Sequence, residues 1–459
     1  MHIADVISVD PLWLEKWNRA VPRYTSYPTA PQFHVLETEK IFDSFTICGA
    51  SKKPLSLYIH IPFCKTMCLF CGCSVVLNRK PERARSYLEK LLTEIDLASR
   101  RLGGIKTISQ LHLGGGTPTS LDEEELTRLM SVLRDHFLIE ESAEISIEVD
   151  PRTVFADGAQ KLETLRKLGF NRISFGVQDL DPRVQEAVKR RQSEEMTIAT
   201  YEHARRLGFG GISIDLIYGL PLQTPASFRN TAETLTRLKP DRISLFSYAK
   251  VPWMKPHQNA IREEDLPSAS DKFQIYAETR RTFMEAGYVA IGMDHFALPH
   301  DSIAIAYTEG KLMRNFQGYS VESAEDLLGL GMSSIGFVSG TYLQNVKTIE
   351  EYEARLAQGQ LPILRGFVLG PDDLLRRWVI QQIMCRFRLD KGAFEERFSV
   401  SFDHYFALEK PALKQLIEEG LVEETQEAIR ATPTGRLFIR LVAVVFDRYA
   451  GVGRFSRAI

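Results

Sequence analysis

The sequence predicts an α/β fold in which parallel strands alternate with helices. Between about residues 55 and 293, short runs rich in β-branched residues alternate with longer, charged amphipathic stretches, and a run at 288–294 could extend the sheet. This alternation is typical of parallel βαβ units, and six such units favour a barrel, complete or incomplete, over a flat sheet. The predicted strands span residues 55–61, 108–113, 143–149, 172–177, 211–217 and 242–247. The predicted helices span residues 82–101, 122–137, 157–168, 194–207 and 224–238.

The chain on either side of these units has a different character. Residues 1–50 include a Pro-, Tyr- and Thr-rich run at 22–33, which predicts an ordered arm rather than a regular helix or strand. Beyond about residue 360 the pattern predicts a smaller, mostly helical domain with a winged-helix character, over residues 360–459. Its predicted elements are helices near 371–386, 402–419 and 433–449 and strands near 421–424 and 428–431. A barrel domain over residues 51–350 lies between the arm and this domain.

The overall composition is that of an ordinary globular protein. A formal net charge of -2 over 459 residues gives no indication of nucleic-acid binding. No apolar run approaches the roughly 18 residues that a membrane span needs. The first residues lack the positively charged and then apolar pattern of a secretion signal. We therefore expect a cytoplasmic protein that neither spans a membrane nor binds nucleic acid.

The cysteines indicate a metal site. Four of the six lie between residues 64 and 73, whereas a disulfide framework would spread them along a shorter chain. Cys64, Cys68 and Cys71 have the spacing C-x3-C-x2-C directly after the first predicted strand. Three thiolates on one loop can hold three irons of a [4Fe–4S] cluster and leave the fourth iron open for chemistry. Tetrahedral zinc is the alternative, with Cys73 or His60 as fourth ligand, but this spacing is unusual for zinc and no second cysteine pair follows.

Polar residues and glycines occur where several predicted strands end. The GGGTP run at 114–118 lets backbone amides approach an anionic ligand, although a tight turn explains it equally well. Glu148, Gln178 and Asp215 lie at or just past strand ends, which converge at one mouth of a parallel barrel. Each could be a helix cap or satisfy a loop. The three together favour a binding site. Arg190 could meet a carboxylate or belong to a solvated helix end.

These motifs together resemble those of the radical S-adenosylmethionine (SAM) superfamily. The shared features are the cysteine spacing with a Phe before the third Cys, GGGTP, an acidic residue ending the next strand, and GVQD. Within the superfamily, RYTSYPTA, PFCKTMCLFCGC, EISIEVDPR, IDLIYGLP, GMDHFALP and RNFQGY are similar to the oxygen-independent coproporphyrinogen III oxidases. The resemblance covers nearly the whole chain, from about Arg23 into the C-terminal domain.

The resemblance implies a (β/α)6 partial TIM-type barrel, an N-terminal arm that covers the substrate and a C-terminal domain that closes the site. It implies Cys64, Cys68 and Cys71 as ligands of a [4Fe–4S] cluster, with Cys73 beside the site but not a ligand. SAM would chelate the remaining iron, and a second SAM would lie close by. The residues implied for the first SAM are Tyr58, Phe70, Gly115 and Glu148. Those implied for the second are Gly116, Thr117, Gln178, Arg190, Asp215, Ala249 and Ile335. Tyr58, Phe316 and Gln317 match positions associated with activity.

The reaction that the resemblance implies belongs to haem biosynthesis. A 5′-deoxyadenosyl radical made from SAM would take hydrogen from a propionate of coproporphyrinogen III, and loss of carbon dioxide and an electron would leave a vinyl group. Repeated on a second ring, this oxidative decarboxylation gives protoporphyrinogen IX. An electron donor such as flavodoxin or ferredoxin would reduce the cluster, and the family is usually monomeric. The substrate carboxylates need cationic partners. Arg23 could be one, or it could be a surface arginine beside a tyrosine.

Two alternatives differ from this reading. A haem chaperone paralogue keeps the cysteine motif but typically lacks the RYTSYPTA arm and the Gly72–Cys73 pair. Both features are present here, which favours the oxidase. The second alternative is a non-catalytic zinc or electron-transfer module carried on a barrel.

Overall fold

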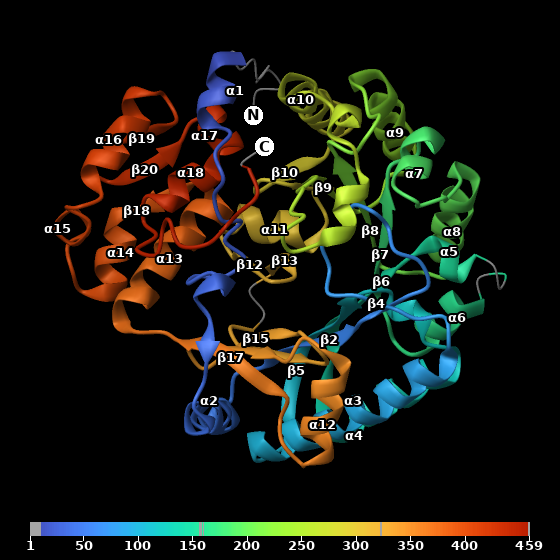
Figure 1. Ribbon diagram of the computed structural model, residues 1–459. Coiled ribbons are helices and arrows are strands. Elements are labelled where there is room, and N and C mark those ends of the chain that lie inside the picture. The colour runs from blue at the N-terminus through green and yellow to red at the C-terminus, as the bar shows by residue number, and fades with distance from the viewer. Residues whose placement is uncertain (1–10, 156–157, 159, 322–323, 458–459) are drawn as a thin grey trace. The chain divides into compact units, whose positions relative to one another are not determined.

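The computed structural model describes residues 11–155, 158, 160–321 and 324–457, which form two compact units (Figure 1). The first unit contains residues 11–32, 216–321 and 370–457. The second unit contains the other described residues, which lie within 33–215 and 324–369. The predicted 1–50 arm and 157–168 helix begin outside the described ranges. The proposed division into arm, barrel domain and C-terminal domain stays a prediction.

The second unit is built on a sheet whose central strands are parallel. The parallel strands of this sheet, in their order across it, are β14 (Leu327–Leu330), β2 (Leu55–Ile61), β5 (Lys106–Gly115), β6 (Phe137–Val149) and β7 (Arg172–Gln178). The first residues of β8 (Gly211–Tyr218) come next in the order. Beyond β14, the antiparallel strands are β15 (Ile335–Val338), β16 (Thr341–Asn345), β17 (Ile363–Val368) and β1 (His34–Val35). Strand β2 is buried at six of seven positions, as expected of a parallel strand covered on both faces.

Helices connect these strands, and local sequence signals set their ends. They are α2 (Thr38–Ala50), α3 (Pro81–Leu102), α4 (Glu123–His136), α5 (Pro151–Val154), α6 (Gln160–Lys167), α7 (Pro182–Ala187), α8 (Glu194–Arg206) and α12 (Ile349–Ala357). Helix α3 begins with Pro81 and ends at Gly103, whose φ of 72° is left-handed. Asp122 and Glu125 form a capping box at the start of α4. Helices α3 and α4 pack side by side (Figure 1).

The first unit combines the end of β8 and three strands that pair antiparallel with one another with two smaller sheets and a group of helices. Strand β9 (Arg242–Ser247) pairs antiparallel with β11 (His295–Ala297), which pairs with β10 (Val289–Ile291). A hairpin joins β12 (Leu312–Asn315) to β13 (Gly318–Val321), and β20 (Ala428–Ala431) lies between β18 (Arg388–Asp390) and β19 (Val422–Glu424). The helices are α1 (Pro11–Trp17), α9 (Pro225–Leu238), α10 (Ala269–Glu285), α11 (Ser302–Thr308), α13 (Pro371–Arg386), α14 (Lys391–Phe398), α15 (Phe402–Tyr405), α16 (Lys410–Glu418), α17 (Pro433–Leu437) and α18 (Ile439–Val444).

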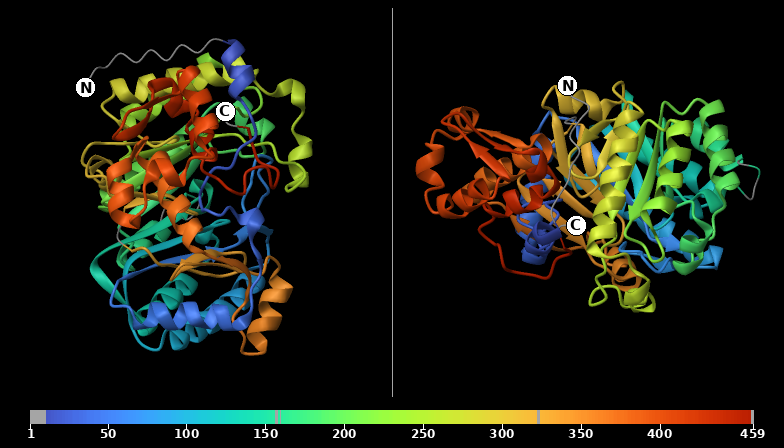
Figure 2. Two further views of the ribbon diagram at one scale, coloured as in Figure 1. Left: turned by 90° about the vertical axis from the view of Figure 1, so that its left-hand side faces the viewer. Right: turned by 90° about the horizontal axis from the view of Figure 1, so that it is seen from above.

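The N-terminal segment of the first unit packs on the C-terminal helices. Trp17, Tyr24 and Tyr27 belong to one buried cluster with apolar residues of α13 and α18. The Tyr24 hydroxyl donates to Asp447 at 3.0 Å, and Arg440 Nε donates to the Pro22 carbonyl at 2.9 Å. Figure 2 shows this blue segment beside the red C-terminal elements. The N-terminal and C-terminal parts of the described chain therefore share one core.

The predicted α/β fold class is confirmed, and each of the six predicted barrel strands corresponds to an observed strand. Two helix predictions were wrong in length. The stretch 402–419 is broken into α15 and α16, because Phe406–Glu409 leave the helix and Pro411 restarts it. The stretch 433–449 is broken at Phe438 into α17 and α18. The run at 288–294 does extend the sheet, as the antiparallel strand β10.

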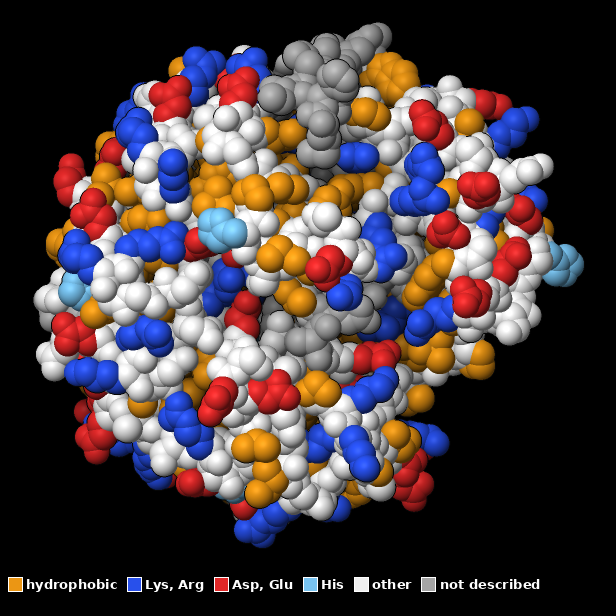
Figure 3. Space-filling model, turned by 180° about the vertical axis from the view of Figure 1, so that it is seen from behind, with side chains coloured by type: hydrophobic (Ala, Val, Ile, Leu, Met, Phe, Trp, Pro, Cys, Tyr) orange, Lys and Arg blue, Asp and Glu red, His pale blue; other side chains and the backbone are white. Residues whose placement is uncertain are grey.

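The described part of the chain contains no helix with the length and apolar character that a membrane crossing requires. On the face shown in Figure 3, lysine and arginine side chains are interspersed with acidic ones. This mixture agrees with a formal net charge of -2.

Candidate functional site

The three predicted cluster ligands lie on one loop of the second unit. The loop follows β2 and is enclosed by a short parallel pair, β3 (Phe63–Cys64) and β4 (Val76–Leu77). The Cys71 N–H donates to the Cys68 carbonyl at 3.1 Å, and the Asn78 N–H donates to the Cys64 carbonyl at 2.9 Å. The loop is therefore held at both ends and folded back within itself, so that its three thiols occupy one small region.

Two guanidinium groups lie beside the middle thiol. Arg190 Nη1 is 3.6 Å and Arg152 Nη2 is 3.8 Å from Cys68 Sγ, and the Cys68 residue is 8% exposed. Cys64 Sγ contacts Thr117 Oγ1 at 3.4 Å, and burial raises the pKa of Cys64 to about 11. Metal coordination requires the thiolate, so binding of a metal cluster displaces the proton from Cys64.

The donor set fits an iron–sulfur cluster better than a single zinc ion. Both ring nitrogens of His60 are engaged, since Nε2 donates to the Ser74 carbonyl at 2.9 Å and Nδ1 lies 3.0 Å from the Tyr58 hydroxyl. The ring nitrogens of His60 are therefore not available to a zinc ion as its fourth ligand. Among the described residues, no group of three or more His, Cys, Asp or Glu side chains is gathered to hold one metal ion. A cubane differs, because it binds each thiolate through a separate iron and keeps the thiolates apart.

The glycine run after β5 packs directly against the end of β2. A Cβ on Gly116 would lie 2.5 Å from the Pro62 carbonyl oxygen, and one on Gly115 would lie 2.5 Å from the His60 ring. Gly115 also has a φ of 115°, which side chains disfavour. The Gly116 N–H donates to the Ile61 carbonyl at 2.8 Å. These glycines thus have a packing role, and they bring the backbone of residues 115–117 against the cysteine loop.

Glu148 ends β6 and is held beside this turn. Its Oε2 accepts from the Gly115 N–H at 3.0 Å, and its Oε1 lies 3.5 Å from His112 Nε2. Burial by itself raises the pKa of Glu148, but the interactions with His112 and the Gly115 N–H outweigh it and leave the pKa below its usual value. The Glu148 side chain is still 42% exposed. It is therefore an anionic group with an accessible face at neutral pH.

Arg190 forms a buried ionic group with two residues that the sequence did not single out. Its Nη1 lies 3.4 Å from Asp150 Oδ2, and Arg152 Nη2 donates to the same oxygen at 2.6 Å. Burial raises the pKa of Asp150, but Arg190 and Arg152 hold it below its usual value. The buried Arg190 Nε has no hydrogen-bond partner among the described residues, so this guanidinium retains donor capacity. In the sequence, the DPR run directly after β6 was the feature that could have pointed to Asp150 and Arg152.

The other predicted residues of the second unit lie at strand ends or in the cysteine loop. Gln178 ends β7 with a φ of 72°, a backbone conformation that is uncommon outside glycine and often found at functional sites. Asp215 accepts from the Ser174 hydroxyl at 3.2 Å. Phe70 lies between Cys68 and Cys71, and Ile335 begins β15. Tyr58 lies on β2 with its ring stacked 5.9 Å from that of His112.

Three predicted residues belong to the first unit. Ala249 follows β9, and its carbonyl accepts from Gln258 Nε2 at 3.3 Å. Phe316 and Gln317 form the turn between β12 and β13, where the Gln317 N–H donates to Asn315 Oδ1 at 2.9 Å. The Gln317 side chain is exposed and that of Phe316 is half-buried. Their roles stay predictions.

Comparison with known proteins identifies the family. A model of the radical SAM superfamily matches residues 58–235, and one of the HemN C-terminal domain matches residues 369–438. The oxygen-independent coproporphyrinogen III oxidase of Salmonella typhimurium is 44% identical to this chain, and the match covers 97% of each protein. The enzyme of the same name from Pseudomonas aeruginosa is also 44% identical, and that match covers 99% of this chain and 100% of the relative. The solved structure of the coproporphyrinogen III oxidase of Escherichia coli matches with a TM-score of 0.90 and 42% identity, covering 97% of this chain and 100% of the other. The chain belongs to the family of oxygen-independent coproporphyrinogen III oxidases.

Family membership decides between the alternatives. A radical SAM protein uses a [4Fe–4S] cluster and SAM, which accounts for three cysteines on one loop without a fourth ligand. The zinc module is therefore excluded. The haem chaperone reading is not favoured, because the relatives that match along nearly the whole chain are oxidases of this family.

In this oxidase-family chain, we expect His60 to make the free energy of unfolding depend on pH. Burial lowers the pKa of His60 below its ordinary value of 6.5. Between that value and the lower folded pKa only the unfolded chain binds the proton, so the free energy of unfolding falls as the pH drops below about 6.5. One such group contributes a slope of at most about 1.4 kcal/mol per pH unit.

Denaturant unfolding of the full chain at several pH values between about 5 and 7 measures this slope. In a His60→Gln variant, where the amide can still donate to Ser74 and accept from Tyr58, we expect a shallower slope. An unchanged slope in this variant would assign the pH dependence to other groups.

Proposed function

We propose that the protein catalyses the oxygen-independent oxidative decarboxylation of two propionate side chains of coproporphyrinogen III, giving the two vinyl groups of protoporphyrinogen IX. The observation that carries this proposal is 44% identity along 97% of the chain to enzymes of that name. The cysteine loop adds independent support, because a cluster with an open iron is a site for chemistry rather than an electron relay alone.

The chain's own residues would hold and orient the cofactors. Cys64, Cys68 and Cys71 would bind the [4Fe–4S] cluster, and when bound, the cluster and SAM supply the 5′-deoxyadenosyl radical that removes a hydrogen from the propionate. Glu148 offers its accessible carboxylate to the cationic end of SAM, since the Gly115 N–H and His112 fix its direction. Phe70 would provide apolar contact within the same loop. Tyr58, Phe316 and Gln317 are the proposed catalytic residues.

We further propose that a second SAM binds at residues of the same site. The residues assigned to it are Gly116, Thr117, Gln178, Arg190, Asp215, Ala249 and Ile335. Support comes from Arg190, which is only 7% exposed, retains a buried N–H without a hydrogen-bond partner in the described chain, and suits a carboxylate.

The number of SAM molecules can be counted directly. Equilibrium dialysis of the anaerobically reconstituted protein with labelled SAM should give two molecules per cluster. In an Asp215→Asn variant, which can still accept from Ser174, we expect the second site to weaken at least about tenfold through loss of charge. A single SAM per cluster in the unmodified protein would rule out the second site.

The remaining partners follow from the reaction. The cluster needs a low-potential one-electron donor, for which flavodoxin or ferredoxin is proposed. We propose a cytoplasmic location and a monomeric state, both open to fractionation and light scattering.

The reaction itself is tested with coproporphyrinogen III under strict exclusion of oxygen, with SAM and reduced flavodoxin or dithionite. Expected products are carbon dioxide, methionine and, after oxidation, protoporphyrin fluorescence. Reactions without SAM, or without reductant, serve as controls. SAM cleavage that never yields carbon dioxide from the porphyrinogen would contradict the assignment of this substrate.

A further inference from the structure

A buried glutamate of the second unit connects α3 to the turn that follows β14. Glu94 on α3 is only 1% exposed. Its Oε2 accepts from the Gly331 N–H at 2.7 Å and from the Tyr352 hydroxyl at 2.5 Å. Its Oε1 accepts from Asn345 Nδ2 at 2.6 Å. The three donors belong to the turn after β14, to α12 and to β16, so one carboxyl group holds together elements that are far apart in the sequence.

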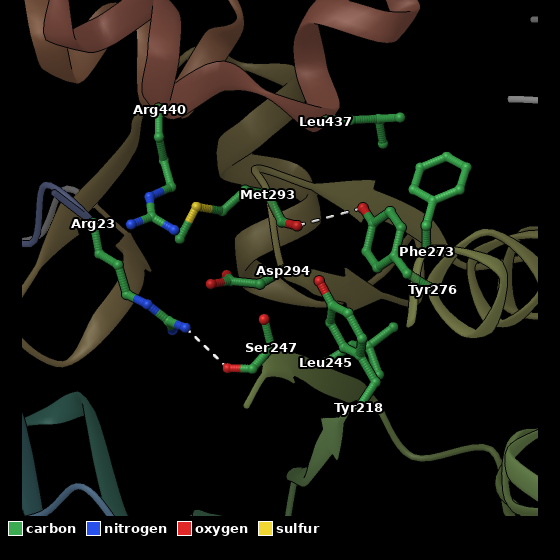
Figure 4. Close-up of a pocket in the computed structure, with 10 residues that line it drawn as sticks. All are labelled: Arg23, Tyr218, Leu245, Ser247, Phe273, Tyr276, Met293, Asp294, Leu437 and Arg440. Carbon is green, nitrogen blue, oxygen red and sulfur yellow. Dashed lines mark hydrogen bonds between the residues drawn. The ribbon is translucent and has the colours of Figure 1, made fainter. Parts of the chain in front are cut away.

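The Glu94 carboxyl group has no cationic neighbour among the described residues. Other deeply buried carboxylates do have one. Arg152 Nη2 donates to Asp150 at 2.6 Å. Asp294, which lines a small pocket of the first unit (Figure 4), lies 3.8 Å from Arg314 Nη2. A buried carboxyl without a counter-ion lowers stability relative to an apolar side chain, and burial raises the pKa of Glu94 to about 7 although its three hydrogen bonds oppose this. Stability therefore does not explain why a carboxyl group lies here.

A second side chain of α3 contacts the same turn. Tyr87 lies two helical turns before Glu94, on the same face of α3. Its hydroxyl accepts from the Met332 N–H at 2.9 Å and donates to the His60 carbonyl at 2.8 Å. The backbone pairing of β14 with β2 ends at Leu330. The Tyr87 hydroxyl therefore bridges the two chain segments just beyond the point where their own pairing stops.

The turn between β14 and β15 is shaped to fit these two side chains. Gly331 has a φ of 93°, and a Cβ on it would lie 2.7 Å from the Tyr87 hydroxyl. Ser333 has a φ of 64°, which is uncommon outside glycine. The Gly331 carbonyl accepts from the Ser334 hydroxyl and from Asn345 Nδ2, both at 2.8 Å. The turn is therefore held in one conformation through its N–H groups and its carbonyl alike.

This turn lies at the same edge of the sheet as the cysteine loop. Strands β14 and β2 are parallel, so the turn 331–334 after β14 and the cysteine loop after β2 begin at neighbouring carboxyl ends. Ser333 Oγ lies 3.5 Å from His60 Nε2. Ile335, assigned above to the second SAM, begins β15 directly after the turn. Displacing the turn would therefore displace Ile335, and small displacements of positioning groups have large effects on a bound ligand.

We propose that Glu94 and Tyr87 are positioning residues for SAM binding: without touching the ligand, they fix the turn 331–334, and with it Ile335, beside the cysteine loop. The inference rests on the proposed function, which assigns Ile335 to a SAM. It also accounts for the buried carboxyl group. Three donors converge on this position, and a carboxylate is the side chain of this size that accepts at both of its ends.

Equilibrium dialysis of labelled SAM with the full cluster-loaded chain tests this role. In Glu94→Gln the side chain keeps its size, but in either orientation of the amide at least one of the three donors loses its acceptor. We expect the Kd of the second SAM to rise about tenfold, because a buried donor without a partner destabilises the turn that precedes Ile335. The Kd of the first SAM and the iron content should stay unchanged. Tyr87→Phe, which leaves the Met332 N–H without its acceptor, should act in the same direction.

Two further measurements separate positioning from general stability. Hydrogen exchange of a peptide covering residues 327–338, followed by mass spectrometry, should be faster in both variants, whereas peptides of α4 should not change. The matched control is Glu125→Gln. Glu125 is a buried glutamate on the neighbouring helix α4, where its Oε2 accepts from the Asp122 N–H at 2.9 Å and caps its own helix. That variant should keep both SAM affinities.

The other outcomes count against the inference. Unchanged SAM affinity in Glu94→Gln overturns it. Equal weakening of both SAM molecules, or a lower thermal transition alone, assigns Glu94 a structural role. If Glu94→Gln does not fold, Tyr87→Phe carries the test by the same criteria. A single SAM per cluster in the unmodified protein removes the second site and this inference with it. If the two sites respond as expected but no vinyl groups form from coproporphyrinogen III, the proposed function fails while the positioning role stands.

Discussion

A Cys68→Ala variant is expected to lose its [4Fe–4S] cluster and, with it, all SAM cleavage. Cys68 is the middle residue of the three predicted ligands, and neither Cys64 nor Cys71 can replace it without leaving its own iron. Two thiolates do not hold a cubane that already has one iron without a protein ligand. We therefore expect methionine formation to fall at least about a hundredfold, which corresponds to roughly 3 kcal/mol or more.

The loss should be visible before any assay of turnover. Iron and sulfide content, together with the brown visible absorption of the anaerobically reconstituted protein, report the cluster directly. The matched control is Cys48→Ala, because Cys48 is a buried thiol on α2, outside the loop. That variant should keep its iron. Full iron content in Cys68→Ala would contradict the ligand assignment, whatever the activity.

The position of Arg152 and Arg190 adds a second consequence of this substitution. Both guanidinium groups lie within 3.8 Å of Cys68 Sγ, and both also contact Asp150. Removing the sulfur takes one acceptor away from Arg152 and Arg190, but the Asp150 carboxylate that both arginines contact remains. The fold around α5 should therefore survive in Cys68→Ala, so that loss of iron can be read as loss of a ligand rather than as unfolding.

Sequence periodicity was sufficient for the regular elements of the barrel. Strand β2 and helix α3 were predicted to within one residue at each end, because one is a continuous apolar run and the other a long amphipathic stretch with Pro81 and Gly103 at its ends. Helix α2 was missed because it follows the irregular segment 22–33 and was read as part of an arm. The short strands β14–β17 were missed because they lack a clear alternating pattern.

The residues of the candidate site also fall into those that the sequence predicts locally and those that only the fold brings together. Cys64, Cys68 and Cys71 are close in sequence, so their spacing alone predicts a shared site. Arg190 and Cys68 are 122 positions apart, and only the folded chain brings their side chains to 3.6 Å. Asp150 and Arg152 follow β6 as a helix cap, and a capping residue has no local feature that shows it also pairs with a distant arginine. Contacts of this range depend on strand order, which the sequence does not encode locally.

Substituting glutamine for Glu148 is expected to weaken SAM binding about 10- to 100-fold while leaving the cluster in place. A charge-assisted hydrogen bond contributes roughly 1.5–3 kcal/mol, and the substitution removes the charge but hardly changes the shape. The glutamine oxygen can still accept from the Gly115 N–H. His112 Nδ1 faces the Ser146 hydroxyl at 2.7 Å, which can donate or accept, so the His112 ring can change tautomer and accept from the new amide.

This design separates charge from structure, because every hydrogen bond around residue 148 can be remade in the variant. Isothermal titration of SAM into the cluster-loaded protein measures the change, with Glu141→Gln, an exposed position on the same strand, as the control. Since the pKa of Glu148 lies below its usual value, the carboxylate stays charged as the pH falls from 8 to about 6. Its contribution to SAM affinity should therefore be constant over that interval. Equal Kd values for Glu148→Gln and the unmodified protein would mean that the carboxylate serves the turn at Gly115 and not the ligand.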